Sequence, residues 1–142
     1  MKVLFDTNVV LDALLDRDPW AEAAVLLFAK VESGELVGHL GATTLTTIYY
    51  IASRNKDTDA ADEMMQDLLR LFEVAPVNRV VLEGALASGF VDFEDAVLHE
   101  AGRSVGAGAL TTRNPGHFTK STLRVYAPDA LVAALEETRG AR

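Results

Sequence analysis

Short apolar runs alternate along this chain with longer segments in which apolar residues recur at helical spacing. A short run that is apolar along its whole length is typical of a strand buried on both faces of a parallel sheet. The pattern predicts five such strands, at residues 2–5, 35–40, 74–76, 107–111 and 124–127.

The segments between these strands predict helices. Their expected ranges are 9–15, 20–31, 42–53, 59–72, 79–88, 93–105 and 128–137. Asp18 and Pro19 have the pattern of an N-cap followed by proline at the first helical position. The segment 59–72 has the clearest apolar stripe, which consists of Ala61, Met64, Met65, Leu68, Leu69 and Phe72. This stripe is expected to be core, although part of it could serve as a surface for a second copy or a partner.

Alternating strands and helices predict an α/β protein in which helices cover both faces of a mostly parallel five-stranded sheet. The absence of a repeat, a low-complexity segment or a linker predicts that residues 1–142 form a single domain. Sites in such sheets form where the carboxyl ends of the strands meet the loops that follow. Asp6 and Asn114 follow the first and fourth predicted strands, so both are expected near this edge.

The amino-acid composition excludes several kinds of site. The chain has no cysteine, which excludes disulfides, thiolate nucleophiles and cysteine-rich zinc sites. The longest apolar stretch, residues 23–29, is far shorter than the roughly 18 residues of a membrane span. Asp6 interrupts any candidate signal peptide, so we expect a cytoplasmic protein.

The net charge of −8 argues against a protein that coats nucleic acid through a basic stripe. The charge is uneven, because residues 1–112 carry 8 basic and 18 acidic side chains while residues 113–142 carry 5 and 3. Such an acidic body suits either carboxylates that hold a cation or an ordinary acidic surface.

Three carboxylates are the main candidates for chemistry. Asp92 and Asp95 lie about 60° apart on one face at the start of the helix predicted at 93–105, with His99 between them in projection. Acids in a first helical turn are common caps, so this pair has a purely structural interpretation as well. Together with Asp6 they would repel one another unless a cation neutralised them. Oxygen ligands without cysteine favour Mg²⁺ or Mn²⁺ over zinc.

Three segments together resemble the PIN-domain family: Phe5-Asp6-Thr7-Asn8, then Asp92-Phe93-Glu94-Asp95-Ala96, then Thr112-Arg113-Asn114-Pro115-Gly116-His117-Phe118. The resemblance covers nearly the full chain in order and spacing. It implies a three-layer α/β/α sandwich with a parallel five-stranded sheet, whose acidic cluster binds Mg²⁺ or Mn²⁺ and cleaves RNA. Short members of this family are often VapC-type toxins that a small antitoxin protein neutralises.

The resemblance assigns roles position by position. Asp6 matches the first acid of the family and Asp95 the acid on the later helix, whereas Asp92 matches an acid that only some members have. Asn8 matches a polar residue that supports the first acid. These matches make Asp6, Asp92 and Asp95 the expected catalytic residues and metal ligands.

Two positions depart from the family pattern. Thr47 stands where members usually have Glu, and Asn114 stands where they often have Asp. Both side chains can accept hydrogen bonds from metal-bound water, but neither carries charge. One ion is therefore plausible with the three aspartates, while a permanently filled second metal position is doubtful.

Other polar residues receive smaller roles. Arg113 and Lys120 flank the expected crevice and are candidates for binding RNA phosphates. His99, Asp12 and Asp16 are expected to be solvated.

The leading hypothesis is a metal-dependent endoribonuclease that acts as a toxin, with an antitoxin partner and assembly as a homodimer. The alternative is a PIN-like module that has weakened catalysis and binds RNA or a protein, because two usual acids are missing.

Overall fold

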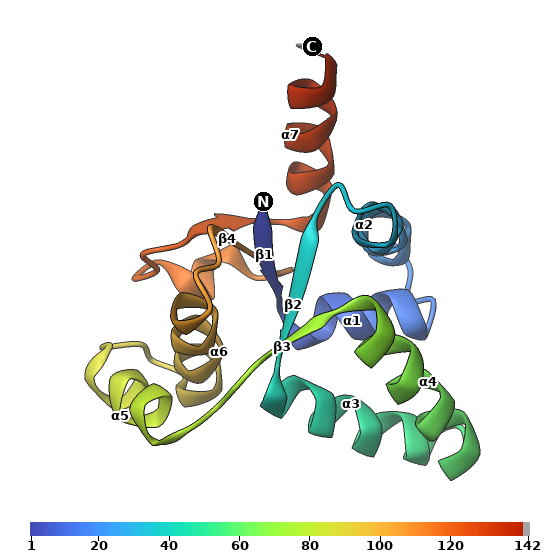
Figure 1. Cartoon of the computed structure of the whole chain (residues 1–142), viewed down its shortest axis with the longest axis horizontal. Helices are drawn as coiled ribbons and strands as arrows, with labels where there is room; N and C mark the ends of the chain where they lie inside the picture. The colour runs from blue at the N-terminus through green and yellow to red at the C-terminus, as the bar shows by residue number, and fades with distance from the viewer. Residues whose placement is uncertain (141–142) are drawn as a thin grey trace.

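The computed structural model of the chain describes residues 1–140, and a five-stranded sheet runs through its centre (Figure 1). The strands are β1 (Lys2–Phe5), β2 (Val37–Gly41), β3 (Glu73–Ala75), β4 (Ala109–Thr111) and β5 (Arg124–Tyr126). Their order across the sheet is β3-β2-β1-β4-β5, and all four neighbouring pairs are parallel. The first strand of the chain is therefore central, and its carboxyl end lies beside those of β2 and β4.

The helices follow the predicted ranges to within a few residues. They are α1 (Thr7–Leu14), α2 (Ala21–Glu32), α3 (Ala42–Asn55), α4 (Thr58–Leu71), α5 (Arg79–Ala87), α6 (Phe93–Ser104) and α7 (Pro128–Gly140), with a 3-10 turn, η1, at Pro115–Phe118. The turn η1 was not predicted.

The predicted start of the second helix at Asp18 and Pro19 is wrong. The helix α2 begins at Ala21, and its N-cap position is taken by Trp20, whose side chain makes no capping hydrogen bond. Residues 18–20 form a turn, and the Ala21 N–H donates a hydrogen bond of 2.8 Å to the Arg17 carbonyl across it. Asp18 therefore precedes the helix and does not cap it.

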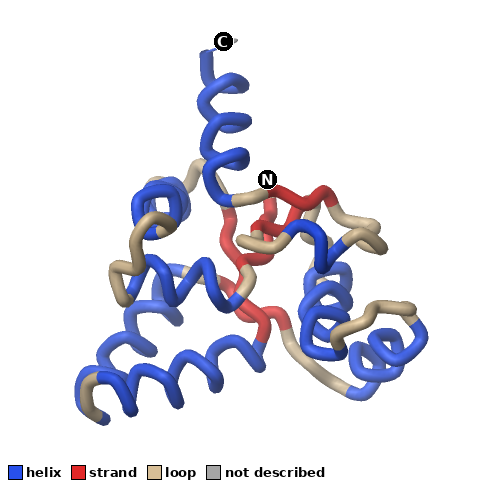
Figure 2. Tube along the Cα trace, turned by 180° about the vertical axis from the view of Figure 1, so that it is seen from behind, coloured by secondary structure: helices blue, strands red, loops and turns tan. Residues whose placement is uncertain are grey.

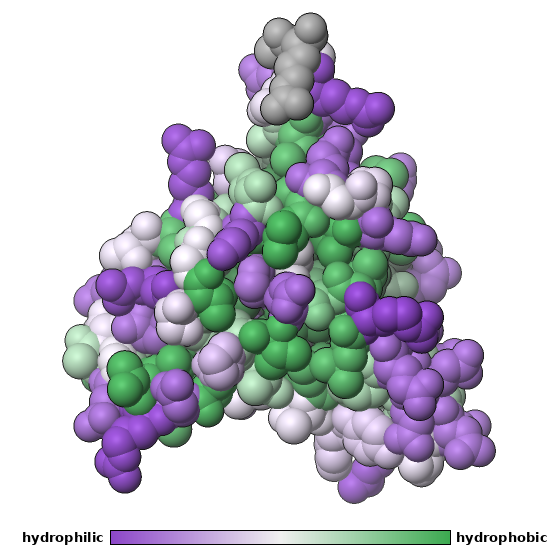
Figure 3. Space-filling view, viewed as in Figure 1, coloured by the Kyte–Doolittle hydropathy of each residue, from purple (hydrophilic) through white to green (hydrophobic). Residues whose placement is uncertain are grey.

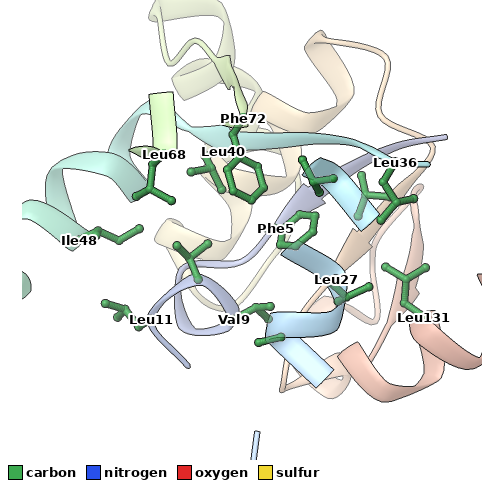
Figure 4. Packing of buried hydrophobic residues seen from close by; sticks show 14 of the residues in the cluster. Phe5, Val9, Leu11, Leu27, Leu36, Leu40, Ile48, Leu68, Phe72 and Leu131 are labelled. Carbon is green, nitrogen blue, oxygen red and sulfur yellow. The ribbon is translucent and has the colours of Figure 1, made fainter. Parts of the chain in front are cut away.

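Two hydrophobic cores lie on opposite faces of the sheet, because successive strand residues point to opposite sides. Val3 and Phe5 face the larger core, to which α1–α4 and α7 contribute. The Phe5 ring packs edge-on against Phe72 with 5.1 Å between centroids (Figure 4). Leu4 faces the smaller core, under α5 and α6. The predicted three-layer α/β/α sandwich with a parallel sheet is confirmed.

Two helices begin directly at the carboxyl ends of strands, so their first turns lie at one edge of the sheet. α1 follows β1 after a single residue, and α3 follows β2 without a gap. Figure 1 shows α3 below the strands and α6 beside them, while Figure 2 shows the same arrangement from behind. α7 begins one residue after the carboxyl end of β5, and in Figure 1 it extends past the N-terminus of the chain, away from α3. Lys30 of α2 holds it through an ion pair of 2.7 Å with Glu136.

None of the helices in residues 1–140 is long and apolar enough to cross a membrane.

The buried sheet residues are expected to dominate the stability of the fold. Leu110 is fully buried in the smaller core, so Leu110→Ala should lower the free energy of unfolding by about 2–5 kcal/mol. Leu69 is 53% exposed, and Leu69→Ala should change this free energy by no more than about 0.5 kcal/mol. Urea denaturation followed by circular dichroism measures both. Equal effects of the two substitutions would contradict the described packing.

Candidate active site

A cleft of about 550 Å³ lies at the carboxyl ends of the central strands. Segments distant in the sequence line it: the start of α1, the first turns of α3, the start of α6 and the loop after β4. The six residues predicted as acids or supporting polar groups all line this cleft: Asp6, Asn8, Thr47, Asp92, Asp95 and Asn114. The structure therefore brings together side chains that are up to 108 positions apart in the chain, and the expectation that the carboxylates share one pocket is met.

Asp6 forms the floor of the cleft and is 8% exposed. It is the N-cap of α1, where its Oδ1 accepts a hydrogen bond of 2.8 Å from the Thr7 N–H. Its Oδ2 accepts a second bond of 2.7 Å from the Thr112 hydroxyl. Burial raises the pKa of the Asp6 carboxyl above its ordinary value, while the hydrogen bonds from Thr112 and Thr7 oppose that rise. The carboxylate is thus fixed in position but imperfectly neutralised.

The loop after β4 orients Asp6 through Thr112. The hydroxyl of this threonine donates to Asp6 and also accepts a hydrogen bond of 3.1 Å from the Asn114 N–H. The Asp6 N–H donates to the Thr111 carbonyl at 3.0 Å. Both side chain and backbone of Asp6 are therefore tied to β4, and Asn114 is placed beside it by the same loop.

Asp92 is partly a structural residue. It is the N-cap of α6, and its Oδ1 accepts a hydrogen bond of 3.0 Å from the Asp95 N–H. The capping interpretation of the sequence is thus correct, but it does not exclude a role in the cleft, because Asp92 is exposed and its second carboxylate oxygen makes no hydrogen bond described within residues 1–140.

The pKa of Asp95 is shifted by its burial and by the neighbouring carboxylates. Burial, followed by the carboxylates of Asp92 and Asp6, raises its pKa to about 6. His117 opposes this rise, since its Nδ1 lies 3.7 Å from Asp95 Oδ2. Asp92 and Asp6 therefore lie close enough to Asp95 to destabilise its charged form.

The α3 side of the cleft is uncharged. The Thr47 hydroxyl donates to the Thr43 carbonyl at 3.0 Å, so its lone pairs stay available to the cleft. Thr44 is buried and shares a hydrogen bond of 2.8 Å with Thr7, which joins the starts of α1 and α3. Thr47, Asn8 and Asn114 add hydrogen-bonding atoms to the cleft without adding charge.

The structure separates the two cations predicted to bind RNA. Arg113 does not line the cleft: its Nε lies 2.9 Å from Asp12 Oδ2, and its guanidinium stacks 4.0 Å from the centroid of Trp20. Lys120 lines a neighbouring pocket that shares Asp92 and Asp95 with the cleft.

Two expectations of solvated side chains are wrong. His99 is 2% exposed: it lies outside the acidic cleft, its Nε2 accepts a hydrogen bond of 3.0 Å from the Thr122 N–H, and its ring packs against Phe90. Asp12 is fully buried, because Arg113 provides the counter-ion that sequence spacing does not reveal. Both errors have the same cause, namely that their partners lie on distant segments.

His117 and Thr112 are site residues that were not predicted as such. His117 lines the cleft and pairs with Asp95, although the sequence gives it no partner at ligand spacing. The available signal was position: both residues follow the fourth strand, whose end lies next to Asp6.

The donor set fits a hard divalent cation. Carboxylate, hydroxyl and amide oxygens surround the cleft, and a cation would relieve the mutual repulsion that raises the pKa of Asp95. Within residues 1–140, no three His, Asp or Glu side chains are already arranged to bind a metal. Mg²⁺ tolerates this, because one or two carboxylates with water and substrate phosphate are a common set of ligands for it.

A family model described as PIN domain matches residues 2–115. No curated protein sequence matches the chain.

Three solved structures illustrate the likeness in fold. A toxin–antitoxin complex from Klebsiella pneumoniae is 19% identical, with 89% of this chain and 97% of that chain covered and a TM-score of 0.69. VapBC-1 from nontypeable Haemophilus influenzae is 16% identical, with coverage of 91% and 99% and a TM-score of 0.69. VapC20 from Mycobacterium tuberculosis, described as a toxin that cleaves the sarcin–ricin loop, is 19% identical, with coverage of 76% and 86% and a TM-score of 0.61.

The raised pKa of Asp95 predicts that the folded protein becomes less stable as pH rises. Asp95 titrates near pH 6 in the folded protein against an ordinary value of 3.8, so the folded state holds more protons between these values. The free energy of unfolding should therefore fall as pH rises from about 4 through 6. Asp95→Asn removes this effect and should be more stable than the parent at pH 8, with the difference vanishing below pH 4.

Urea denaturation across this pH range measures the effect. Glu63→Gln, at an exposed acid on α4, is the matched control. The difference between its free energy of unfolding and that of the parent should not change over this pH range. An Asp95→Asn variant whose stability relative to the parent is independent of pH would contradict the assignment.

Proposed function

This chain belongs to the PIN-domain family, and from that membership we propose that it is a metal-dependent endoribonuclease that hydrolyses RNA phosphodiester bonds. One observation carries the proposal: Asp6, Asp92 and Asp95 line one cleft, where burial and the charges of Asp92 and Asp6 raise the pKa of Asp95 to about 6. A charge cluster of this kind is a common feature of catalytic sites and is relieved by a bound cation.

The cofactor in this proposal is Mg²⁺ or Mn²⁺, with Asp6 and Asp95 as ligands. When bound, the ion supplies positive charge that activates water and offsets the charge developing on the scissile phosphate. Asp92, whose outer oxygen is not used in capping, is a third ligand or orients the attacking water. Thr112 keeps Asp6 Oδ2 in a fixed direction.

The uncharged residues complete the proposed site. Thr47, Asn8 and Asn114 orient water in the cleft through hydrogen bonds, and none adds a charge. A fourth carboxylate, Glu94, also lines the cleft but is exposed; with Asp6, Asp92 and Asp95 as the ligands, we propose a single resident ion.

Because the protein carries a net charge of −8, binding of RNA phosphates requires cationic side chains near the cleft. Lys120 is the more accessible of the two predicted residues, since it is exposed and lies in the pocket next to the acids. Arg113 is 19% exposed and engaged by Asp12, so its contribution to RNA binding is to hold the loop that carries Asn114.

We further propose that the protein is the toxin of a toxin–antitoxin pair and acts in the cytoplasm on cellular RNA. Residues 1–142 form one domain in this proposal. The structures of similar fold include toxin–antitoxin complexes, which supports a small antitoxin protein as the partner. Exposed apolar side chains provide the surfaces for an antitoxin and for a second copy of the chain. They lie on α5 (Val80, Leu82 and Leu86) and at or near α2 (Trp20, Val25 and Leu26). Figure 3 shows hydrophobic side chains at the surface in the region of α5, at the lower left.

A second candidate function is a PIN-like module that binds RNA or a protein without efficient hydrolysis. It is favoured by the replacement of two usual acids by Thr47 and Asn114, and by the absence of a preformed three-ligand group in residues 1–140.

Substitution of the acids should separate the two functions. Asp6→Asn and Asp95→Asn should each lower Mn²⁺-dependent cleavage of a fluorescent single-stranded RNA by about 100-fold or more, because the site loses several kcal/mol of charge stabilisation. Glu63→Gln should cleave like the parent, and circular dichroism should report intact folds.

Calorimetric titration with MnCl₂ is the companion measurement. The parent should bind Mn²⁺ and Asp6→Asn should bind it more weakly. An absence of Mn²⁺ binding, together with cleavage that does not depend on Asp6, would favour the binding module.

Self-association has its own test. The homodimer should appear in light scattering at micromolar concentration, and a charge introduced into its apolar contact should yield monomers. Leu86→Glu and Leu26→Glu change the two exposed sets separately, since these side chains are 75% and 46% exposed. A parent protein that is monomeric at these concentrations would overturn the proposed homodimer.

A further inference from the structure

A second pocket, of about 360 Å³, adjoins the acidic cleft. It lies between the loop that joins α5 to α6 and the turn η1, and it shares Asp92, Asp95 and His117 with the cleft. The two cavities therefore adjoin and form one trough, with Asp92, Asp95 and His117 at their junction. Its volume is in the range of sites that accept small molecules.

The walls of this second pocket are chemically different from those of the cleft. Phe90 and Val91 supply an apolar side, and Val91 is fully exposed at the surface. The Phe90 ring is held from behind by Phe118, at 5.9 Å between centroids, and by His99 at 4.9 Å. A rigid aromatic wall of this kind suits a flat, partly apolar group such as a nucleobase.

The rim of the pocket carries a cation, Lys120, that does not line the cleft. Lys120 forms no ion pair within residues 1–140, and its Nζ lies close over Gly89, where an added Cβ would be 3.2 Å away. His117 is 64% exposed at the boundary with the cleft. An ammonium and an imidazole above an apolar wall match a phosphate attached to a base.

Resting on the proposed RNA hydrolysis, we propose that this pocket binds the nucleotide adjacent to the scissile phosphate of a single-stranded RNA. The base lies against Phe90 and Val91, and the phosphate of that nucleotide contacts Lys120. The acids then act on the next phosphate along the strand, at the junction of the two cavities. The pocket thus selects the base beside the cleavage position.

Two substitutions test the pocket without touching the acids. Lys120→Gln removes the phosphate contact. Gly116→Leu fills the pocket: an added Cβ at Gly116 meets no atom within 4 Å, so the fold should tolerate the larger side chain. The matched controls are Lys56→Gln, at an exposed lysine after α3, and Ala130→Leu, at an exposed position of α7 that lines neither cavity.

The measurement is fluorescence anisotropy with fluorescein-labelled hexaribonucleotides of A, C, G or U, in the Asp6→Asn background so that the probe stays intact. Each pocket variant should weaken binding by about 5- to 100-fold, which corresponds to the loss of one stacked base or one phosphate contact. Lys120→Gln should weaken the four RNAs equally and reduce the salt dependence, whereas Gly116→Leu should change their rank order. The controls should bind within twofold of the background protein.

The outcomes separate this inference from the proposed hydrolysis. RNA affinity within twofold of the background in both pocket variants would overturn the nucleotide pocket, even where Asp6→Asn abolishes cleavage. Reduced RNA affinity in both variants would support the pocket even where the parent fails to cleave RNA. Loss of a copurifying protein partner with unchanged RNA affinity would assign the pocket to that partner and overturn the inference.

Discussion

The repulsion that Asp6 and Asp92 exert on the half-buried carboxylate of Asp95 is the constraint on which the cleft depends. Burial raises the pKa of Asp6 and, together with the neighbouring acids, that of Asp95. Such groups stay together only because the fold determines their positions independently of their charges. Asp6 is fixed by the central strand, the start of α1 and the Thr112 hydroxyl. Asp95 is carried on α6, whose N-cap is itself one of the repelling acids. The unfavourable electrostatics are thus concentrated at one point, where a cation can bind.

The cleft has a charged side and an uncharged side. The acids come from β1 and α6, whereas α3 contributes Thr47 and the loop after β4 contributes Asn114. This asymmetry places the proposed ion on the acidic side and leaves uncharged side chains on the α3 side of the cleft. The positive charge of the site lies further along, at Lys120, where the trough continues. A substrate that carries regularly spaced phosphates matches this sequence of charges.

The sequence predicted the elements that periodicity determines and missed what distant contacts determine. All five strands and seven helices were predicted, because strands buried on both faces and amphipathic helices have distinct patterns. The acids were predicted from their places at a strand end and in a first helical turn. Burial of His99 and Asp12 was not, since Thr122 and Arg113 lie 23 and 101 positions away. The same limitation concealed His117, whose partner Asp95 lies on another element.

The ion pair between Lys30 and Glu136 limits how far the chain can be shortened from its C-terminal end while its core stays closed. The family match ends at residue 115, but Leu131 beyond it is fully buried in the larger core, and Tyr126 packs against that core. A polypeptide trimmed to the matched segment would lack the edge strand β5, leave Lys30 with Glu35 as its remaining described partner, and open the core beneath α7. The smallest unit that keeps this interior closed is therefore longer than the segment that identifies the family.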